Sequence, residues 1–443
     1  MTVPGASRDA ALDRILEEIA GRFAAGFPEE APALRTVGRE AEFPLVNPDG
    51  SAADVSTLWP GLLDLGGFRP IYDRAVDGSE FLAGVEADTW SCVIEVGKAT
   101  VELSVGPRAT LHGLARDMER GLDALLEVVR QKDLRLLGYG IQPRTPAGED
   151  LLTGKRRYQA LLKAIGPAWL DFCVTAGDQA QIDVGREDVV RQMNLTNAAS
   201  GAIIALTANS SVYDGSVGRF ASGREGLAAN MAGEPDRHGS SPYPFADLEQ
   251  YTRFLAGLRC LCLPDEDGGF EPIGLPFSRY LRQKTSSEDP ERAYQEFLFH
   301  EHYIWPSARP RSRIGTLEVR PACQQPAGSG WVPSALALGL VEAAEEAQAF
   351  FEDALGPDYW PELRRFRGAA VEKGLKAPEP APGFLETLLG IIRGGLERRG
   401  HGEEVFLDPA FRRLERRLEP AARSREAFEL GGMDTLVGEL SIS

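Results

Sequence analysis

The chain has 443 residues, and 66 acidic against 48 basic side chains give it a net charge of −18. A charge of this size repels phosphate backbones and anionic membrane surfaces, so we expect neither nucleic acid nor a membrane as a partner. No stretch is apolar for long enough to span a bilayer, and residues 1–13 lack the basic and apolar regions of a secretory signal.

The cysteine content points to a reducing compartment. There are five cysteines, an odd number in a long chain, which disfavours a disulfide framework. We therefore expect a cytoplasmic location. Hydrophobic residues make up 43% of the chain, enough for a sizeable core, and the length allows one large enzyme domain or two ordinary ones.

Hydrophobic periodicity divides the chain into helices and short strands. Apolar residues at three- and four-residue spacing predict a first helix over 12–23, which ends before Pro28. Alternating runs and flanking turn residues predict the strands, and longer amphipathic or apolar runs predict the later helices. The predicted strands are 36–46, 68–72, 80–85, 91–104, 134–141, 175–184 and 314–321, and the later helices are 110–131, 187–209 and 334–354.

The order of these elements favours an α+β fold, with an antiparallel or mixed sheet and helices packed on one side, because strict βαβ alternation is absent. Residues 233–244 and 264–272 have the composition of surface loops. The Pro-rich stretch 376–383 is typical of a linker, and charged helices follow it to about residue 430. We therefore divide the chain into a main domain, 1–375, and a linker with a C-terminal helical extension, 376–443.

Polar side chains recur on one face of several predicted strands. Residues i and i+2 of a strand share a face. Glu40 therefore lies with Glu42, Gln179 with Gln181, and Glu318 with Arg320, each pair opposite an apolar face. Glu102 also points away from its apolar neighbours, and Glu95 is on the run that leads to it.

Neighbouring strands of this kind would form a sheet face rich in carboxylates. Such carboxylates repel one another unless cations lie among them, and many hard oxygen donors suit Mg²⁺ or Mn²⁺. Arg320 would add a fixed cation for a phosphate or a carboxylate. The alternative is a solvated outer sheet face, which shows the same alternation, although the expected Lys-rich outer surface is missing from these segments.

Three further patterns have a functional and a structural interpretation. His300-Glu301-His302 would suit a metal pair on a strand, but its aromatic surroundings favour a buried role. Cys260 and Cys262 would suit a redox or soft-metal site, but no second pair is near, which favours packed thiols. Arg309, Arg311 and Arg313 form either a solvated loop or an anion clamp in front of the Glu318 strand.

The same strands resemble a known family, the glutamate–cysteine ligases of the plant and bacterial type. The matching segments keep the family's order and spacing over about residues 36–350. They are VGREAEFPLV (37–46), IEVGKATVELSVGP (94–107), GYGIQP (138–143), Arg157-Tyr158, QAQID (179–183), TANS (207–210) and TLEVR (316–320).

This resemblance implies a glutamine-synthetase-like fold, in which a curved, mostly antiparallel sheet forms a funnel with helices outside. It implies ATP-dependent amide formation by the domain over 1–375. A carboxylate, such as the γ-carboxylate of glutamate, attacks the γ-phosphate of ATP, and an amine such as that of cysteine then displaces phosphate. The implied cofactors are ATP and Mg²⁺ or Mn²⁺, the partners are small-molecule substrates, and we expect a monomer or a homodimer.

Site residues follow from the resemblance together with the strand pattern. Arg320 would stabilise the transferring phosphoryl group beside Glu318, and Arg157 would contact a substrate carboxylate. Gln179 and Gln181 would orient the nucleotide or metal-bound water, and Arg309 and Arg313 would bind its phosphates. The expected metal ligands, or residues directly behind them, are Glu40, Glu42, Glu95, Glu102 and Glu318.

Departures from the family pattern leave the substrates open. The family's Pro-Gly-Gly is Val96-Gly97-Lys98 here, Val174 occupies a position where Arg is frequent, and Cys323 stands near an expected acid. Three hypotheses result. The first is a ligase that joins glutamate to cysteine, the second is the same chemistry with another carboxylate or amine, and the third is a non-catalytic protein that binds a nucleotide or a divalent ion.

Overall fold

The main sheet is open and antiparallel throughout. A computed structural model describes residues 4–229, 231–265, 268–284 and 289–443. The strands are ordered β14-β15-β7-β1-β5-β4-β3-β2, and β6 pairs with β1. Their bounds are β1 Val37–Val46, β2 Arg69–Arg74, β3 Glu80–Glu86, β4 Trp90–Ile94, β5 Thr100–Arg108, β6 Arg135–Leu136, β7 Gly177–Asp183, β14 Ala308–Arg311 and β15 Thr316–Cys323. The predicted α+β fold with a mostly antiparallel sheet is confirmed.

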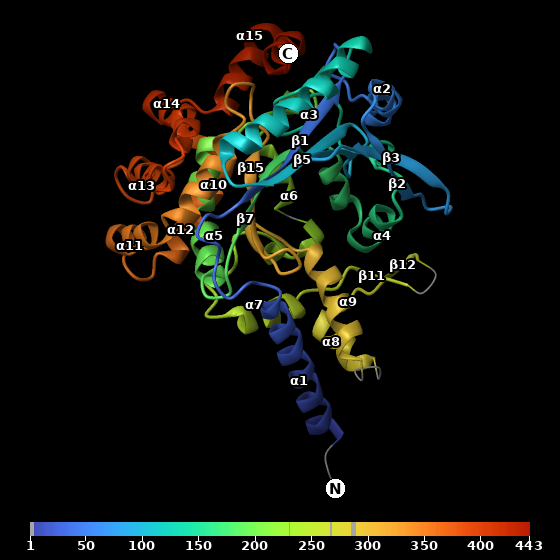
Figure 1. The fold of residues 1–443 in the computed structure, drawn as a ribbon, viewed down its shortest axis with the longest axis vertical. Helices are drawn as coiled ribbons and strands as arrows, with labels where there is room; N and C mark the ends of the chain where they lie inside the picture. The colour runs from blue at the N-terminus through green and yellow to red at the C-terminus, as the bar shows by residue number, and fades with distance from the viewer. Residues whose placement is uncertain (1–3, 230, 266–267, 285–288) are drawn as a thin grey trace.

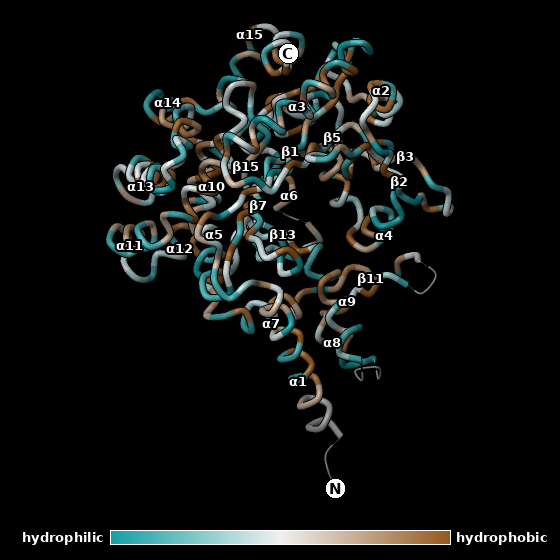
Figure 2. The backbone as a smooth tube through the Cα atoms, in the orientation of Figure 1, coloured by the Kyte–Doolittle hydropathy of each residue, from teal (hydrophilic) through white to brown (hydrophobic). Residues whose placement is uncertain are grey.

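Helices cover the apolar face of this sheet. Helix α3 packs on β4 and β5, α10 on β7, and α5 on β14 and β15 (Figure 1). Apolar residues recur along α10, whereas β7 is hydrophilic (Figure 2). The helices are α1 Pro4–Ala25, α2 Trp59–Leu65, α3 Leu111–Gln131, α4 Arg156–Ile165, α5 Val189–Thr207, α6 Gly223–Ala228, α7 Leu248–Gly257, α8 Phe277–Gln283, α9 Pro290–His302, α10 Val332–Glu342, α11 Ala344–Leu355, α12 Trp360–Lys373, α13 Phe384–Arg399, α14 Asp408–Arg416 and α15 Pro420–Leu440.

Alternation along the strands gives the sheet two different faces. The dry face is mostly apolar and packs under the helices, and the wet face carries polar side chains. In β1, Val37, Ala41 and Phe43 are buried in the core under the helices, so Glu40 and Glu42 must face the other way. The wet face is bordered by α4, the C-terminal end of α9 and two short strands, β10 His238–Gly239 and β13 Trp305–Pro306. The other short strands are β8 Val212–Tyr213, β9 Ser216–Val217, β11 Cys262–Pro264 and β12 Phe270–Pro272.

Several predicted elements were wrong in extent. The strand over 134–141 is only β6, Arg135–Leu136, because the chain then pairs through isolated bridges. The helix over 334–354 is two helices, which divide at Ala343. The predicted loops contain short strands, β10 in 233–244 and the pair β11 and β12 in 264–272, of which residues 266–267 lie outside the described residues. None of the helices described is long and apolar enough to cross a membrane.

The chain after residue 376 packs on the main body. Helix α13 lies against α10, and its Phe384, Leu388 and Leu396 are buried in the same core as the sheet. Helix α15 contributes Leu436 and Val437 to a second apolar cluster. The functional boundary near residue 376 stays a prediction.

Candidate active site

A cavity of about 350 Å³ opens on the wet face of the sheet. Five carboxylates line it, namely Glu40, Glu42, Glu95, Glu102 and Glu318. Six cationic side chains line it too, namely Lys155, Arg157, Arg224, Arg309, Arg311 and Arg320. Gln179 and Gln181 complete the set of predicted residues that meet here. Of the predicted site residues, only Arg313 lies outside this cavity.

Strand register brings these residues together. Glu42 lies opposite Glu102 on β5, and Glu40 lies opposite Gln179 on β7. Gln181 lies opposite Glu318 on β15, and Glu318 lies opposite Arg309 on β14. Paired residues on neighbouring strands share a face, so side chains from five separate strands or turns reach one cavity.

Charge changes sign across the sheet in the order of the strands. The edge strand β14 and its neighbour β15 supply Arg309, Arg311 and Arg320, and strands β1 and β5 supply Glu40, Glu42 and Glu102. Strand β7 lies between them and supplies the two amides. The cavity therefore has a basic side and an acidic side, which the neutral side chains of β7 separate.

Glu318 is the anchor of the basic side. Its carboxylate accepts two hydrogen bonds from Arg309, from Nε at 2.9 Å and from Nη2 at 3.1 Å. Arg320 also donates to it, and Arg311 Nε is 3.4 Å away. Burial alone would raise the pKa of Glu318, but the guanidinium groups of Arg309, Arg320 and Arg311 hold it well below its usual range. Arg311 also pairs with Glu301 at 3.4 Å, so three cations share two carboxylates, which leaves one positive charge available to a ligand.

The acidic side of the cavity has more carboxylates than nearby cations. Burial and the charge of Glu95 raise the pKa of Glu42 to about 7. Burial, Glu95 and Glu40 raise the pKa of Glu102 well above its usual range, and burial followed by Glu318 raises that of Glu40. Carboxyl groups that oppose one another's ionisation are those that a divalent cation would stabilise in the charged form.

The two amides of β7 connect the sides. Gln179 accepts a hydrogen bond from Arg320 and donates one to Glu42 Oε1 at 2.9 Å. Gln181 donates to Glu40 Oε1 at 3.2 Å and accepts from Thr316 at 2.8 Å. An amide can accept from a cation and donate to an anion at once, which fixes the direction of both Gln side chains.

Two further cations of the cavity carry no strand signal in the sequence. Arg224 is on the short helix α6, where it pairs with Glu225 at 2.6 Å and donates to the Arg320 carbonyl oxygen at 3.0 Å. Lys155 donates to the Ile94 carbonyl oxygen at 2.8 Å. Arg224 is on a short helix and Lys155 directly precedes α4, so only tertiary packing brings them to the sheet.

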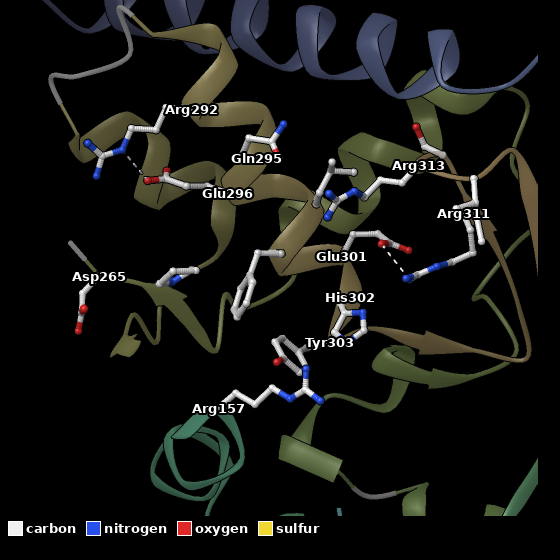
Figure 3. Close-up of a pocket in the computed structure, with 15 residues that line it drawn as sticks. Arg157, Asp265, Arg292, Gln295, Glu296, Glu301, His302, Tyr303, Arg311 and Arg313 are labelled. Atoms are coloured by element: carbon white, nitrogen blue, oxygen red, sulfur yellow. Dashed lines mark hydrogen bonds and ion pairs between the residues drawn. The ribbon is translucent and has the colours of Figure 1, made fainter. Parts of the chain in front are cut away.

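Arg157 joins this cavity to a larger one of about 680 Å³. Its guanidinium lies below Tyr303, on the side of His302 (Figure 3). Nη2 donates to Tyr158 at 3.3 Å, and Nε has no hydrogen-bond partner in the described structure. Arg311 and Arg313 line the larger cavity, with Arg313 exposed at its rim (Figure 3).

His300 and His302 are on the end of helix α9, so the prediction of a strand there was wrong. His300 is buried, stacks on Phe277 and contacts the Leu255 carbonyl oxygen at 2.8 Å, whereas His302 lines the cavity. In the described part of the chain, no group of three or more His, Cys, Asp or Glu side chains is arranged to hold a metal ion. The five carboxylates thus supply suitable oxygen donors without an assembled metal site.

The thiols of Cys260 and Cys262 lie away from the cavity. Both are buried, and burial raises the pKa of both, that of Cys262 to about 12, so they are packed thiols. Of the departures from the family pattern, Lys98, Val174 and Cys323 line neither of the two cavities described above, whereas Val96 lines the smaller one. The departures therefore change the lining of the site at Val96.

Comparison with known proteins identifies the family and the fold. Residues 36–379 match the family model for glutamate-cysteine ligase family 2 (GCS2). The chloroplastic glutamate–cysteine ligases of Arabidopsis thaliana and Medicago truncatula are each 26% identical over 371 residues, which cover 81% of this chain and 69% and 71% of theirs. A glutamate–cysteine ligase from Francisella tularensis, solved in complex with AMP, shares the fold with a TM-score of 0.56 at 10% identity, over 94% of this chain and 88% of that one.

Proposed function

Because the chain belongs to the glutamate-cysteine ligase family and is an ATP-dependent ligase, we propose that it joins the γ-carboxylate of glutamate to the amine of cysteine. The carboxylate oxygen attacks the γ-phosphorus of ATP, the bond from that phosphorus to the bridging oxygen of ADP breaks, and ADP leaves as the acyl phosphate forms. The amine nitrogen then attacks the acyl carbon, phosphate leaves, and the amine gives up a proton. The products are γ-glutamylcysteine, ADP and phosphate.

The observation that carries this proposal is the division of charge across the cavity. Attack of a carboxylate on a phosphate brings two anions together, and a ligase must supply positive charge between them. Arg309, Arg311 and Arg320 supply fixed cations on β14 and β15. The carboxylates of β1 and β5 supply hard oxygen donors across the same cavity.

The acidic side fits Mg²⁺ in its donor chemistry. Glu40, Glu42, Glu95 and Glu102 would hold it, and their raised pKa values at three of the four positions favour a cation there. Bound Mg²⁺ would supply Lewis-acid stabilisation of phosphate charge. Glu318 is already engaged by three guanidinium groups, so its proposed contribution is to orient them behind the metal site.

The remaining roles follow from position. Arg320, whose Nη1 contacts both Gln179 and Glu318, would stabilise the transferring phosphoryl group. Gln179 and Gln181 would orient nucleotide or metal-bound water. Arg309 would keep Arg320 and Glu318 in place, and Arg313 would attract phosphates at the rim. Arg157, with an unpartnered Nε between two cavities, would bind a substrate carboxylate.

The test is a turnover assay with a panel of amines. Purified protein with ATP, Mg²⁺ and glutamate should release ADP when cysteine is added, and mass spectrometry should detect γ-glutamylcysteine. EDTA should abolish the release, and added Mg²⁺ should restore it. Glycine, alanine, serine and 2-aminobutyrate are the comparison amines.

The outcomes separate the three hypotheses. Turnover with another amine but not with cysteine would replace the proposed substrate and keep the chemistry. Thermal stabilisation by Mg-ATP without ADP release from any amine would favour a non-catalytic binding protein. Stabilisation that Glu42→Gln weakens would place the nucleotide in the cavity described above in either case.

A further inference from the structure

A separate pocket of about 270 Å³ lies between α14, α15 and the turn at residues 326–329. It is at the end of the molecule opposite α1 and α9 (Figure 1) and shares no lining residue with the candidate active site. Most of its lining comes from residues 409–440, beyond the segment that matches the family model. The family assignment therefore does not account for it.

Four arginines line this pocket, although the protein as a whole carries a charge of −18. Arg413 is buried, and it donates to the Leu206 carbonyl oxygen and to Ser329 Oγ, each at 2.8 Å. It is the fixed floor of the pocket. The other three, Arg412, Arg416 and Arg423, are exposed side chains at its walls.

These three wall arginines are not neutralised by the protein. Among the described residues, none of them forms an ion pair or a side-chain hydrogen bond. The adjacent Arg417 differs, because it pairs with Glu379 at 2.7 Å and does not line the pocket. Glu439 is the one carboxylate among the lining residues.

Burial and the clustered positive charges together lower the pKa of Arg413. Burial, and then the charges of Arg423 and Arg412, lower the pKa of Arg413 to about 9. A guanidinium is rarely shifted this far, since its ordinary pKa is above 12. The nearby Glu419 only partly offsets the repulsion. An anion in the pocket would remove this cost by pairing with the arginines.

We propose that this pocket binds a compact polyanion, a phosphate ester or a polyphosphate, at a site separate from the catalytic cavity. The planar forks of Arg412, Arg416 and Arg423 match phosphate oxygens in geometry as well as charge. The volume of about 270 Å³ admits a small molecule and excludes a macromolecular segment of any length.

Isothermal titration calorimetry of the full chain with inorganic pyrophosphate tests this site. The triple variant R412Q/R416Q/R423Q should lose affinity at one site by at least about thirtyfold, since each charge-assisted hydrogen bond to an anion contributes several-fold. R417Q is the matched control, because it removes the arginine directly after α14, which pairs with Glu379, and it should bind like the wild type. E439Q should tighten binding by about threefold, since it removes the one opposing charge.

Two further measurements locate the anion. Anomalous density from tungstate-soaked crystals should lie between Arg412, Arg416 and Arg423. ADP release by the triple variant should equal that of the wild type, which separates this site from the catalytic one. Equal pyrophosphate affinities for the wild type and the triple variant, or tungstate density confined to the catalytic cavity, would overturn the proposal whatever the fate of the proposed function.

Discussion

The two faces of the sheet each bury an arginine–carboxylate cluster, and the two clusters differ in charge balance. On the helix-covered face, Arg39 forms two hydrogen bonds with Asp178, at 2.9 Å and 2.5 Å. The same guanidinium donates to the Gly330 carbonyl oxygen and stacks on Trp331 at 4.3 Å. One cation thus meets one anion, and the remaining donor and ring face are satisfied by the protein.

On the wet face, Glu318 is shared among Arg309, Arg311 and Arg320, and the carboxylates opposite them crowd one another. This cluster has unmatched cations on one side and crowded carboxylates on the other. The difference teaches that burial of charge alone does not identify a functional site, because both clusters are buried. An imbalance of charge is the better indicator of a functional site, because a purely structural ion pair matches each cation with an anion.

The largest effect is expected when the wet-face cluster loses a cation. Arg320→Gln should lower kcat by about 10²–10³-fold, the range seen when one preorganised charge donor is removed from an active site. The free energy of unfolding in urea should change by less than about 1 kcal/mol, because Arg309 still pairs with Glu318 and no buried carboxylate is left without a counter-charge. ADP release and unfolding of the same preparation are the measurements.

The exposed Arg365 on α12 provides the control for this variant. Arg365→Gln should keep both turnover and stability, because its partner Glu362 lies on the surface of the same helix. If Arg320→Gln unfolded the protein and left the turnover of its folded fraction unchanged, the wet-face cluster would be structural.

Breaking the pair on the covered face should do the reverse. Asp178→Asn leaves Arg39 buried without its counter-charge and should reduce the free energy of unfolding by about 3–5 kcal/mol. Turnover of the folded fraction at low temperature should stay within about twofold, since the pair does not line the cavity. The double variant Arg39→Met/Asp178→Leu should recover much of the stability, and failure to recover any would contradict a simple closed pair.

The buried His300 of α9 extends the comparison to the pH dependence of stability. Burial holds the pKa of His300 at about 3. The unfolded chain takes up a proton near pH 6.5 that the folded chain refuses until near pH 3, so stability should fall as the pH drops through this window. Between pH 7 and pH 4.5, the free energy of unfolding of His300→Gln in urea should fall by a few kcal/mol less than that of the wild type, on the order of the pKa shift itself.

The exposed His401 is the matched control, and His401→Gln should keep the wild-type slope. An unchanged slope in His300→Gln would mean that the pKa of His300 is the same in the folded and the unfolded chain. Such a result would reopen a polar role for this residue, which its stacking on Phe277 disfavours.

The smallest effect is expected at Arg313, at the rim of the neighbouring cavity. Arg313→Gln should raise KM for ATP about threefold at low salt and leave kcat unchanged, because an exposed cation acts through a screened field. The difference should vanish at about 0.5 M salt, where the Debye length falls to a few ångströms. A large loss of kcat would place Arg313 beside the reacting groups.

Strand alternation already predicted which side chains face the cavity. Glu40, Glu42, Gln179, Gln181, Glu318 and Arg320 share the polar phase of their strands, and the structure keeps each on that face. The same rule also places Arg39 with Ala41 and Asp178 with Ala180, on the apolar phase of two strands. Two opposite charges among the apolar positions of two strands therefore indicated the buried pair of Arg39 and Asp178, which the sequence analysis did not predict.

The sequence by itself therefore determined most strands of the main sheet, their two faces and the family, because alternation and motif spacing are local properties of the chain. It did not predict β14, whose Arg309 and Arg311 were expected in a loop or an anion clamp. Tertiary structure alone decided the strand order that separates arginines from carboxylates, since register depends on contacts between segments far apart. It also brought Lys155 and Arg224 into the cavity and Arg413 under the wall arginines of α14 and α15. These side chains lie in irregular segments or on helices whose neighbours no local pattern specifies.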